Sequence, residues 1–220
     1  MDEIASSNRV RLCGVIADVP VLSHENREER FYIFPLEVER LSGAMDRVNV
    51  ILREASLPLV RHSVYRPLGV EGELRSFNNR SGQGSKLVIT VFARELSLPS
   101  SPVWENTVEL EGTLCKPPTL RVTPMGREIS DLMLAVNRAF GKSDYIPCIA
   151  WGRTARYAAQ LSVGDHLEVQ GRFQSREYQK QLPDGTVINR MAYEVSLSRL
   201  TCVRDIPLAS PAAVRENALQ

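Results

Sequence analysis

The stretch NRVRLCGVI, residues 8–16, returns 98 positions later as NTVELEGTL, residues 106–114. In the second copy Val108, Leu110 and Leu114 alternate with polar residues, which is the period of two of a half-buried strand. The agreement continues without a gap, with identical pairs that include Asn8/Asn106, Gly14/Gly112, Leu36/Leu134, Arg40/Arg138 and Asp46/Asp144. Further on the offset is 99, where VEGELRS at 70–76 faces VQGRFQS at 169–175. A repeat of about a hundred residues is too long for a solenoid unit, so the chain holds two copies of one small domain.

The junction between the copies is SLPSSPVWEN, residues 97–106, whose prolines and serines favour a short extended connector. We therefore expect a first domain at 1–98, a linker at 99–105 and a second domain at 106–203. The segment 204–220 is Ala-rich with two prolines and is expected to be a flexible tail.

Each copy reads as β structure with one helical interruption. Alternating apolar residues predict strands around 106–114, 132–136, 145–151, 167–173 and 193–197. GRTARYAAQLSVGD at 152–165 has good helix formers and ends in Gly-Asp, while LPDG at 182–185 is a hairpin signal. Three strands, a short helix and two strands form the layout of the OB-fold, a five-stranded barrel that binds oligonucleotides or oligosaccharides. The predicted class is all-β, with two tandem OB-fold barrels.

Composition narrows the possible environment of the chain. The 220 residues carry a formal net charge of +1, so a uniformly basic nucleic-acid binder is not indicated. Of the 27 basic residues only four are lysines, which leaves 23 arginines; arginine pairs with phosphate and stacks on rings, although a GC-rich genome explains the bias equally well. There is no run of ~18 apolar residues to predict a membrane span. The N-terminal MDEIASSNRV lacks the features of a secretory signal.

The four cysteines, at positions 13, 115, 148 and 202, have neither CxxC nor zinc-site spacing. They are typical of reduced thiols in a cytosolic protein. The three histidines, at 24, 62 and 166, belong to no triad or metal motif, and the chain has no Gly-rich phosphate loop and no GxSxG. We therefore expect neither catalysis nor a cofactor nor a metal.

The second copy resembles the bacterial single-stranded DNA-binding proteins. The resemblance is carried by NTVELEGTL, then PTLRVTPMGREISDLMLAVNR, then DYIPCIAWGRTARYAAQLSVGDHLEVQGRFQSREY, and it covers residues 106–200. The first copy matches much less well. The resemblance implies sequence-independent binding of single-stranded DNA in replication, recombination or repair, and hence a cytoplasmic, nucleoid-associated protein without a membrane partner.

The same resemblance carries expectations about assembly and partners. Family members commonly place four OB folds around DNA, so this two-domain chain fits a homodimer or a higher homo-oligomer. The strands at 8–14 and 106–112 are candidate pairing edges. The family usually ends in an acidic, hydrophobic tip that recruits replication and repair proteins. This chain ends in RENALQ, with only a faint counterpart at 205–208, which leaves such recruitment open.

Strand parity separates the core of the second copy from a displayed face. Tyr145 and Trp151 share one parity, opposite the compact set Ile146, Cys148 and Ala150. On the next strand Leu167, Val169 and Phe173 are predicted to be core, while Arg172, Gln174, Arg176 and Tyr178 lie opposite. Aromatic rings on which bases stack, together with cations that follow phosphates, are what single-strand binding requires. We assign Tyr157 and Phe173 to the core.

The resemblance implies that stacking aromatics stand at the positions of Phe140, Tyr145, Trp151 and Tyr178. Phe140 is the weakest of the four, because it shares parity with core Leu134 and Val136 unless the hairpin twists it outward. The predicted DNA-binding residues are Phe140, Tyr145, Trp151, Tyr178, Arg138, Lys142, Arg153, Arg172, Gln174 and Arg176.

The first copy has lost these aromatics. The equivalent positions hold Ser42, Arg47 and Arg53, with Asn79 near the fourth. Arg47, Arg53, Arg75 and Phe77 are predicted to form at most an auxiliary DNA contact, and a mainly architectural domain is the alternative. A second function therefore stays open, that of a primosome-type or mobile-element accessory subunit acting through protein interaction. RNA also stays a candidate ligand, because stacking does not read the 2′-hydroxyl.

Overall fold

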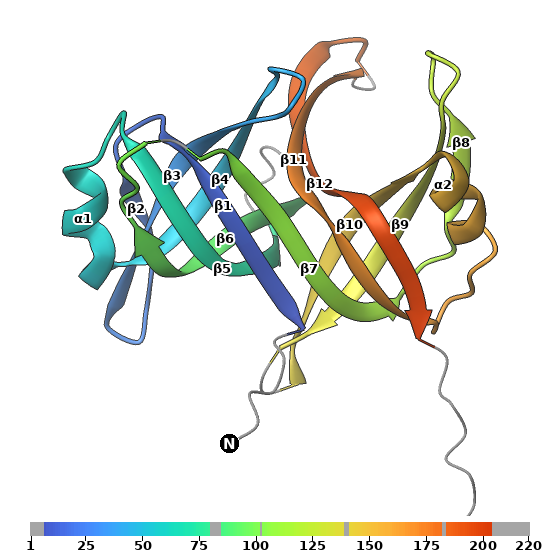
Figure 1. The fold of residues 1–220 in the computed structure, drawn as a ribbon, viewed down its shortest axis with the longest axis horizontal. Helices are drawn as coiled ribbons and strands as arrows, with labels where there is room; N and C mark the ends of the chain where they lie inside the picture. Colours follow the sequence, from blue (N-terminus) through green and yellow to red (C-terminus); the bar gives the residue numbers. More distant parts are fainter. Residues whose placement is uncertain (1–6, 80–84, 102, 139–140, 182–183, 204–220) are drawn as a thin grey trace, which may run out of the picture.

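The computed structural model describes residues 7–79, 85–101, 103–138, 141–181 and 184–203. It contains two β-barrels that lie side by side (Figure 1). The first barrel consists of β1 (Asn8–Ile16), β2 (Val21–Asn26), β3 (Glu29–Glu39), β4 (Met45–Arg53), a 3₁₀ turn (Glu54–Ser56), α1 (Leu57–Arg61), β5 (Pro67–Asn78) and β6 (Leu87–Ser97). The second consists of β7 (Glu105–Leu114), β8 (Thr119–Val122), β9 (Glu128–Asn137), β10 (Ser143–Trp151), α2 (Gly152–Ala158), β11 (His166–Gln181) and β12 (Val187–Val203).

The strand order confirms the predicted pair of OB-folds. It runs β2-β3-β4-β6-β5-β1-β7-β11-β12-β10-β9-β8. The first six strands form one barrel, and the last six are their equivalents in the reverse order. Within each barrel the first OB strand is split, as β1 and β2 or as β7 and β8. The parallel pairs β4–β6 and β10–β12, with the added pairs β1–β3 and β7–β9, close the barrels. Each short helix lies between the third and fourth OB strands, as predicted.

Two equivalent glycines allow the barrels to close. At Gly14 a Cβ atom would overlap the carbonyl oxygen of Glu37, and at Gly112 it would lie 2.8 Å from the carbonyl oxygen of Ala135. Both contacts occur where the first strand of a barrel meets β3 or β9. Only glycine permits this approach of two backbones, so the repeated glycine has a packing reason in both copies.

The helix of the second barrel is shorter than the sequence predicts. It ends at Ala158, and residues 159–165 form turns in which the backbone N–H of Gly164 donates to the carbonyl oxygen of Leu114. Ala155 and Ala158 are the buried residues of this two-turn helix. Tyr157 lies on the opposite side and is 42% exposed, so its assignment to the core is wrong. Phe173 is fully buried, as predicted.

The two barrels are joined by an antiparallel ladder between β1 and β7. Val10 pairs with Val108, its own equivalent in the repeat, and the register extends from Asn8↔Leu110 to Cys13↔Glu105. The ladder therefore has a local pseudo-two-fold axis at this valine pair. The side-chain amides of Asn8 and Asn106 repeat the symmetry, since each bonds both backbone groups of one residue, Leu74 and Phe173 respectively. The two predicted pairing edges thus pair with each other inside one chain.

Buried hydrogen bonds also join the two barrels on both sides of this ladder. Asp46 is fully buried, receives two hydrogen bonds from Arg40 at 2.8 and 2.6 Å, and accepts the backbone N–H of Ser175 from the other barrel at 2.7 Å. In the symmetric copy Asp144 is held by Arg138 and accepts the backbone N–H of Ser76. Arg40 and Arg138 each also donate to the carbonyl oxygen of that serine. We call these two sets the Arg–Asp clamps.

Removing the carboxylate of one clamp should destabilise the whole chain. Asp144→Ala leaves Arg138, Arg75 and the Ser76 N–H without their shared acceptor, and breaking a buried ion pair in this way costs about 3 kcal/mol. The free energy of unfolding from a urea titration measures the effect. Glu71→Ala is the matched control, because the exposed Arg9–Glu71 pair contributes about 0–1 kcal/mol. Equal losses in the two variants would contradict a stabilising clamp.

Candidate nucleic-acid interface

The third OB strand of the second barrel displays two of the predicted aromatics. On β10 the side chains of Tyr145 and Trp151 are 49% and 39% exposed, whereas Ile146, Cys148 and Ala150 are buried in the core. The indole Nε1 of Trp151 donates a 3.0 Å hydrogen bond to Ser196 Oγ on β12, the neighbouring strand. This bond fixes the orientation of the indole ring while leaving it accessible.

The β11–β12 hairpin supplies the cations and the third aromatic. Arg172 and Arg176 are exposed, Gln174 and Tyr178 are partly exposed, and the Arg176 guanidinium lies over the Tyr178 ring at 5.7 Å. Together with Tyr145 and Trp151, these four residues make up what we call the outer face of the second barrel. Tyr145 and Trp151 are six positions apart in the sequence, and so are Arg172 and Tyr178. Each strand therefore spreads its groups over about 20 Å, a spacing suited to an extended ligand rather than a compact one.

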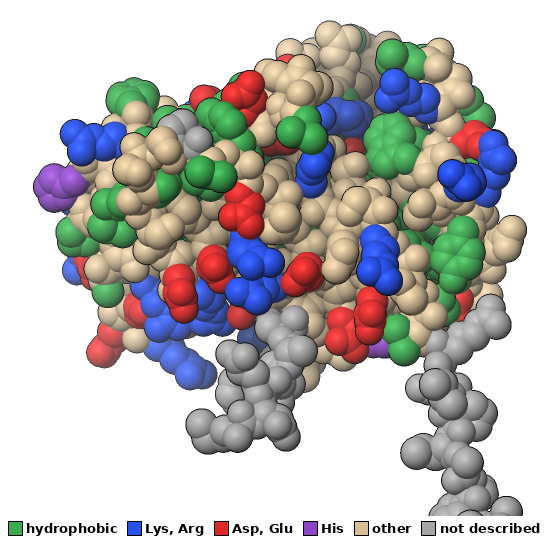
Figure 2. Space-filling view, viewed as in Figure 1, with side chains coloured by type: hydrophobic (Ala, Val, Ile, Leu, Met, Phe, Trp, Pro, Cys, Tyr) green, Lys and Arg blue, Asp and Glu red, His purple; other side chains and the backbone are tan. Residues whose placement is uncertain are grey.

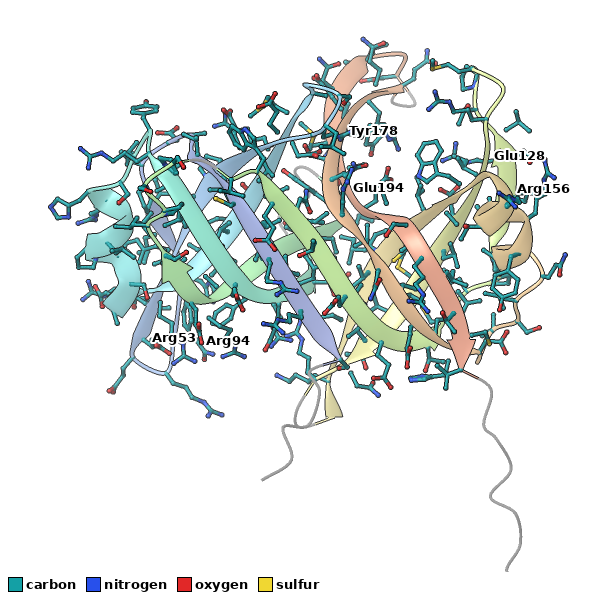
Figure 3. The ribbon with its side chains drawn as sticks, in the orientation of Figure 1. Arg53, Arg94, Glu128, Arg156, Tyr178 and Glu194 are labelled. Atoms are coloured by element: carbon teal, nitrogen blue, oxygen red, sulfur yellow. The ribbon has the colours of Figure 1, made fainter. Side chains whose placement is uncertain are left out.

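The surroundings of this face carry charges of both signs. Figure 3 shows Tyr178 and Glu194 on the β11–β12 hairpin, with Glu128 and Arg156 together at the right of the view, at the start of β9 and on α2. Arg156 bonds Glu128 at 2.6 Å. Figure 2 shows basic and acidic side chains interspersed over the visible side of the molecule rather than gathered in one basic patch. Affinity for a polyanion would then depend on a few individual arginines and not on a continuous basic surface.

Glu194 is the acidic group within this arrangement. It stands opposite Gln174 in the β11–β12 ladder and lies 3.7 Å from Arg176. Burial raises the pKa of its carboxyl group above the ordinary value, with a further rise from Asp131, and the cations Arg176 and Arg121 act against the shift. A carboxylate at this place holds Arg176 and repels an approaching anion.

The four remaining predicted residues differ in where they lie. Lys142 and Arg153 are exposed, one in the β9–β10 connection and the other in the first turn of α2. Arg138 is committed to its clamp, in which Nε and Nη2 donate to the Asp144 carboxylate and Nη2 also donates to the carbonyl oxygen of Ser76. Phe140 lies outside the residues that the structure describes.

The auxiliary residues of the first barrel are largely engaged in ion pairs. Arg47 lies 3.3 Å from Glu37, and Arg53 lies 3.4 Å from Glu29, both pairs being exposed. Arg75 pairs with Glu73 and with Asp144 of the clamp. Phe77 is 47% exposed. The first barrel nevertheless carries further rings that position-by-position comparison misses, above all Phe92 on β6.

The alternation of buried and displayed residues along β6 is the sequence pattern that would have identified the Phe92 ring. Ile89, Val91 and Ala93 are buried core residues, so Thr90, Phe92 and Arg94 share the opposite side of the strand. The register pairs Thr90 with Arg75 and Phe92 with Glu73 on β5. The outer face of the first barrel therefore has aromatic and basic side chains of its own.

Among the described residues no three His, Cys, Asp or Glu side chains are grouped as metal ligands. The four cysteines, all within the described ranges, are free. None of the described helices has the length and apolar character of a membrane span.

The fold and the displayed face define a class, that of tandem OB-fold proteins. The crystal structure of the wild-type single-stranded DNA binding protein from Thermus aquaticus superposes with a TM-score of 0.70 at 23% identity, covering 91% of this chain and 94% of that one. A deletion mutant of the same protein gives the same TM-score and covers 92% of this chain. At this identity the likeness establishes the fold for both barrels.

Sequence comparison identifies the second barrel more narrowly. Residues 105–202, a little under half of the chain, match the model of the single-strand binding protein family. Single-stranded DNA-binding protein A of Bacillus subtilis is 41% identical over 83 residues, which are 34% of this chain and 48% of that protein. Single-stranded DNA-binding protein 2 of Listeria innocua is 41% identical over 81 residues, 34% of this chain and 51% of that protein. The chain thus spans about half the length of these curated relatives.

The raised pKa of Glu194 predicts a pH-dependent effect of Glu194→Gln on stability. The folded state of the parent holds the proton more tightly than the unfolded state, so the parent loses stability as pH rises through the folded pKa. The variant has no such loss. Its free energy of unfolding relative to the parent should therefore increase as the pH rises above the ordinary glutamate pKa of about 4.3, measured by urea titration at each pH. A difference that stays constant with pH would show that Glu194 has an ordinary pKa.

Proposed function

We propose that the second barrel binds single-stranded DNA without sequence preference, protecting it in replication, recombination or repair. The observation that carries the proposal is the outer face, where Tyr145, Trp151 and Tyr178 are accessible next to exposed arginines on a barrel that matches the single-strand binding protein family. The names of the curated relatives, which are single-stranded DNA-binding proteins, support it.

The geometry suits a mechanism of stacking and backbone tracking. Every base has a π-face, so rings spaced along two strands accept any sequence, at about 1–3 kcal/mol per stacked base. Arg172 and Arg176 would neutralise phosphates between the rings and release counterions. The ring of Tyr178 already packs against Arg176, which orients both groups for the strand. We propose Lys142, Arg153 and Gln174 as peripheral contacts and omit Arg138, which the clamp occupies.

We further propose a non-catalytic role for the whole chain, in the bacterial cytoplasm at the nucleoid. The proposed division is a first domain at 1–98, a linker at 99–105, a second domain at 106–203 and a tail at 204–220. Two chains would supply the four OB folds of a homodimer. Because β1 and β7 already pair within one chain, two chains would associate through other surfaces, and a measured solution mass tests this.

Removing two rings of the outer face should weaken DNA binding. Trp151→Ala combined with Tyr178→Ala is expected to lower the affinity for oligo-dT at least tenfold, because each lost stacking site contributes about 1–3 kcal/mol. Fluorescence anisotropy of a labelled oligonucleotide measures the change at fixed salt. Tyr157→Ala is the matched control, since this exposed tyrosine lies on α2 and not on the two strands that carry the outer face. Unchanged affinity of the double variant would refute the platform.

The salt dependence of binding should reveal the phosphate contacts separately. Arg172→Gln is expected to reduce the slope of log K against log[salt] by about one unit, because one fewer phosphate is neutralised. Arg66→Gln, an exposed arginine between α1 and β5, should leave the slope unchanged. An equal reduction in both variants would mean that binding follows net charge rather than the outer face.

A further inference from the structure

The Trp151 side chain stands at the end of its strand. Trp151 is the last residue of β10 and immediately precedes α2, and Gly152 follows it with a φ of 53°. The strand therefore does not continue past the indole ring, and Trp151 is 39% exposed. A side chain in such a place is free to turn between rotamers, so a specific contact has to hold it in one of them.

That contact is the hydroxyl group of Ser196 on β12. The indole N–H, which is the one donor of the ring, donates to Ser196 Oγ across 3.0 Å. In the parallel register Ser196 pairs with Ile149, two positions before Trp151. The indole therefore leans back along β10 and toward β12, over Ile149. This isoleucine is buried although it lies on the displayed side of the strand and outside the core cluster, as a residue covered by the ring would be.

The backbone of Ser196 is a rigid anchor for this bond. β12 is hydrogen-bonded to β10 on one side and to β11 on the other, and the buried residues Val195 and Leu197 flank the serine. On the β11 side the two backbones approach closely at Gly171, where a Cβ atom would overlap the carbonyl oxygen of Ser196. The serine is thus fixed from both sides, and a fixed group can in turn fix a ring.

The lean of the ring brings it toward a proposed phosphate contact. Neighbouring strands lie about 4.8 Å apart, so β10 and β11 are separated by about 10 Å with β12 between them. Arg172 on β11 stands directly opposite Ser196 in the antiparallel ladder. An indole that reaches Ser196 therefore spans part of the gap toward Arg172. One base on the ring and a neighbouring phosphate on the arginine can then be held together.

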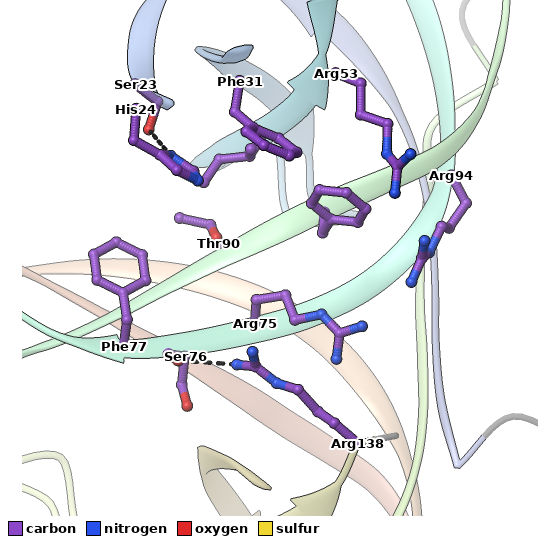
Figure 4. A pocket seen from close by; sticks show the side chains of 12 residues that line it. Ser23, His24, Phe31, Arg53, Arg75, Ser76, Phe77, Thr90, Arg94 and Arg138 are labelled. Atoms are coloured by element: carbon purple, nitrogen blue, oxygen red, sulfur yellow. Dashed lines mark hydrogen bonds between the residues drawn. The ribbon is translucent and has the colours of Figure 1, made fainter. Parts of the chain in front are cut away.

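The first barrel has a different pair at the equivalent places. Arg53 stands in the place of Trp151 and Phe92 in that of Ser196, in the same parallel register. The side chain of Phe92 has no hydrogen-bonding group, and the Arg53 guanidinium lies 5.9 Å from the centroid of its ring. Figure 4 shows Arg53 and Arg94 lining the pocket at this place. The same barrel thus forms without the serine, so the fold alone does not explain the bond between Ser196 and the indole.

We propose that Ser196 is a positioning residue, which holds the Trp151 indole in the orientation in which a base stacks on it. The inference rests on the proposed function and names a residue that acts in it without touching the DNA. A ring that is already ordered loses less conformational freedom when a ligand binds, so the bond raises the affinity for the strand. Loss of the hydroxyl should weaken binding about three- to tenfold, the equivalent of one net hydrogen bond.

Ser196→Ala tests the proposal in the full chain. The variant should show this loss with labelled oligo-dT, whereas Ser196→Thr, which keeps a hydroxyl group, should bind as the parent does. Ser198→Ala is the matched control with parental affinity, because this serine of the same strand bonds the carbonyl oxygen of Gln170 instead. Trp104→Phe leaves Trp151 as the remaining tryptophan. In that background Ser196→Ala should also enlarge the fast component of the indole anisotropy decay, since rotamer motion occurs within nanoseconds.

A double-mutant cycle with Trp151→Phe separates positioning from direct contact. Phenylalanine keeps a ring for stacking but has no N–H, so adding Ser196→Ala to it should cause no further loss of affinity. An equal loss from Ser196→Ala in both backgrounds would overturn the proposal, because the serine would then act without the indole. Parental affinity and an unchanged anisotropy decay in Ser196→Ala would overturn it as well. Failure of the proposed function would look different, since the Trp151→Ala/Tyr178→Ala variant would keep full affinity, and the positioning role would fall with it.

Discussion

The antiparallel ladder between β1 and β7 is the constraint on which the rest of the molecule depends. It merges two barrels into one twelve-stranded sheet around the Val10–Val108 pair. A ladder alone permits twisting and fraying at its ends. The two buried aspartates prevent this, because each ties its own barrel's arginine to a backbone N–H of the other barrel. The relative position of the two outer faces is therefore set by buried, charge-assisted hydrogen bonds, and the short linker does not have to set it.

The clamps explain why two arginines that look suited to phosphate do not face solvent freely. Arg138 and Arg75 converge on Asp144, and their charge is balanced inside the junction. Arg172 and Arg176, by contrast, are exposed on the β11–β12 hairpin. Division of the arginines between a structural and a displayed set is consistent with a net charge of only +1. A chain of this kind attracts DNA at particular places rather than by its overall field.

The sequence predicts the repeat, the barrels and the displayed parity of β10 and β11, because period-two patterns report directly which side of a strand is buried. It does not predict where Tyr157 points, since a two-turn helix has too few residues to define a face. It also cannot assign Arg138. The partner Asp144 lies six positions away, but the Ser76 backbone that completes the clamp lies 62 residues away in the other barrel. Long-range contacts of this kind leave no local pattern.

The interpretation of the first barrel shows a limit of comparing repeats position by position. At the offsets of 98 and 99 the aromatic positions hold polar residues, which suggests a lost platform. Yet Thr90, Phe92 and Arg94 alternate with a buried core set on β6, so a ring stands beside Arg53 on the adjacent strand. A binding surface depends on which groups reach a place in space, and either of two neighbouring strands can supply them. Equivalence between the two barrels is therefore better judged face by face than residue by residue.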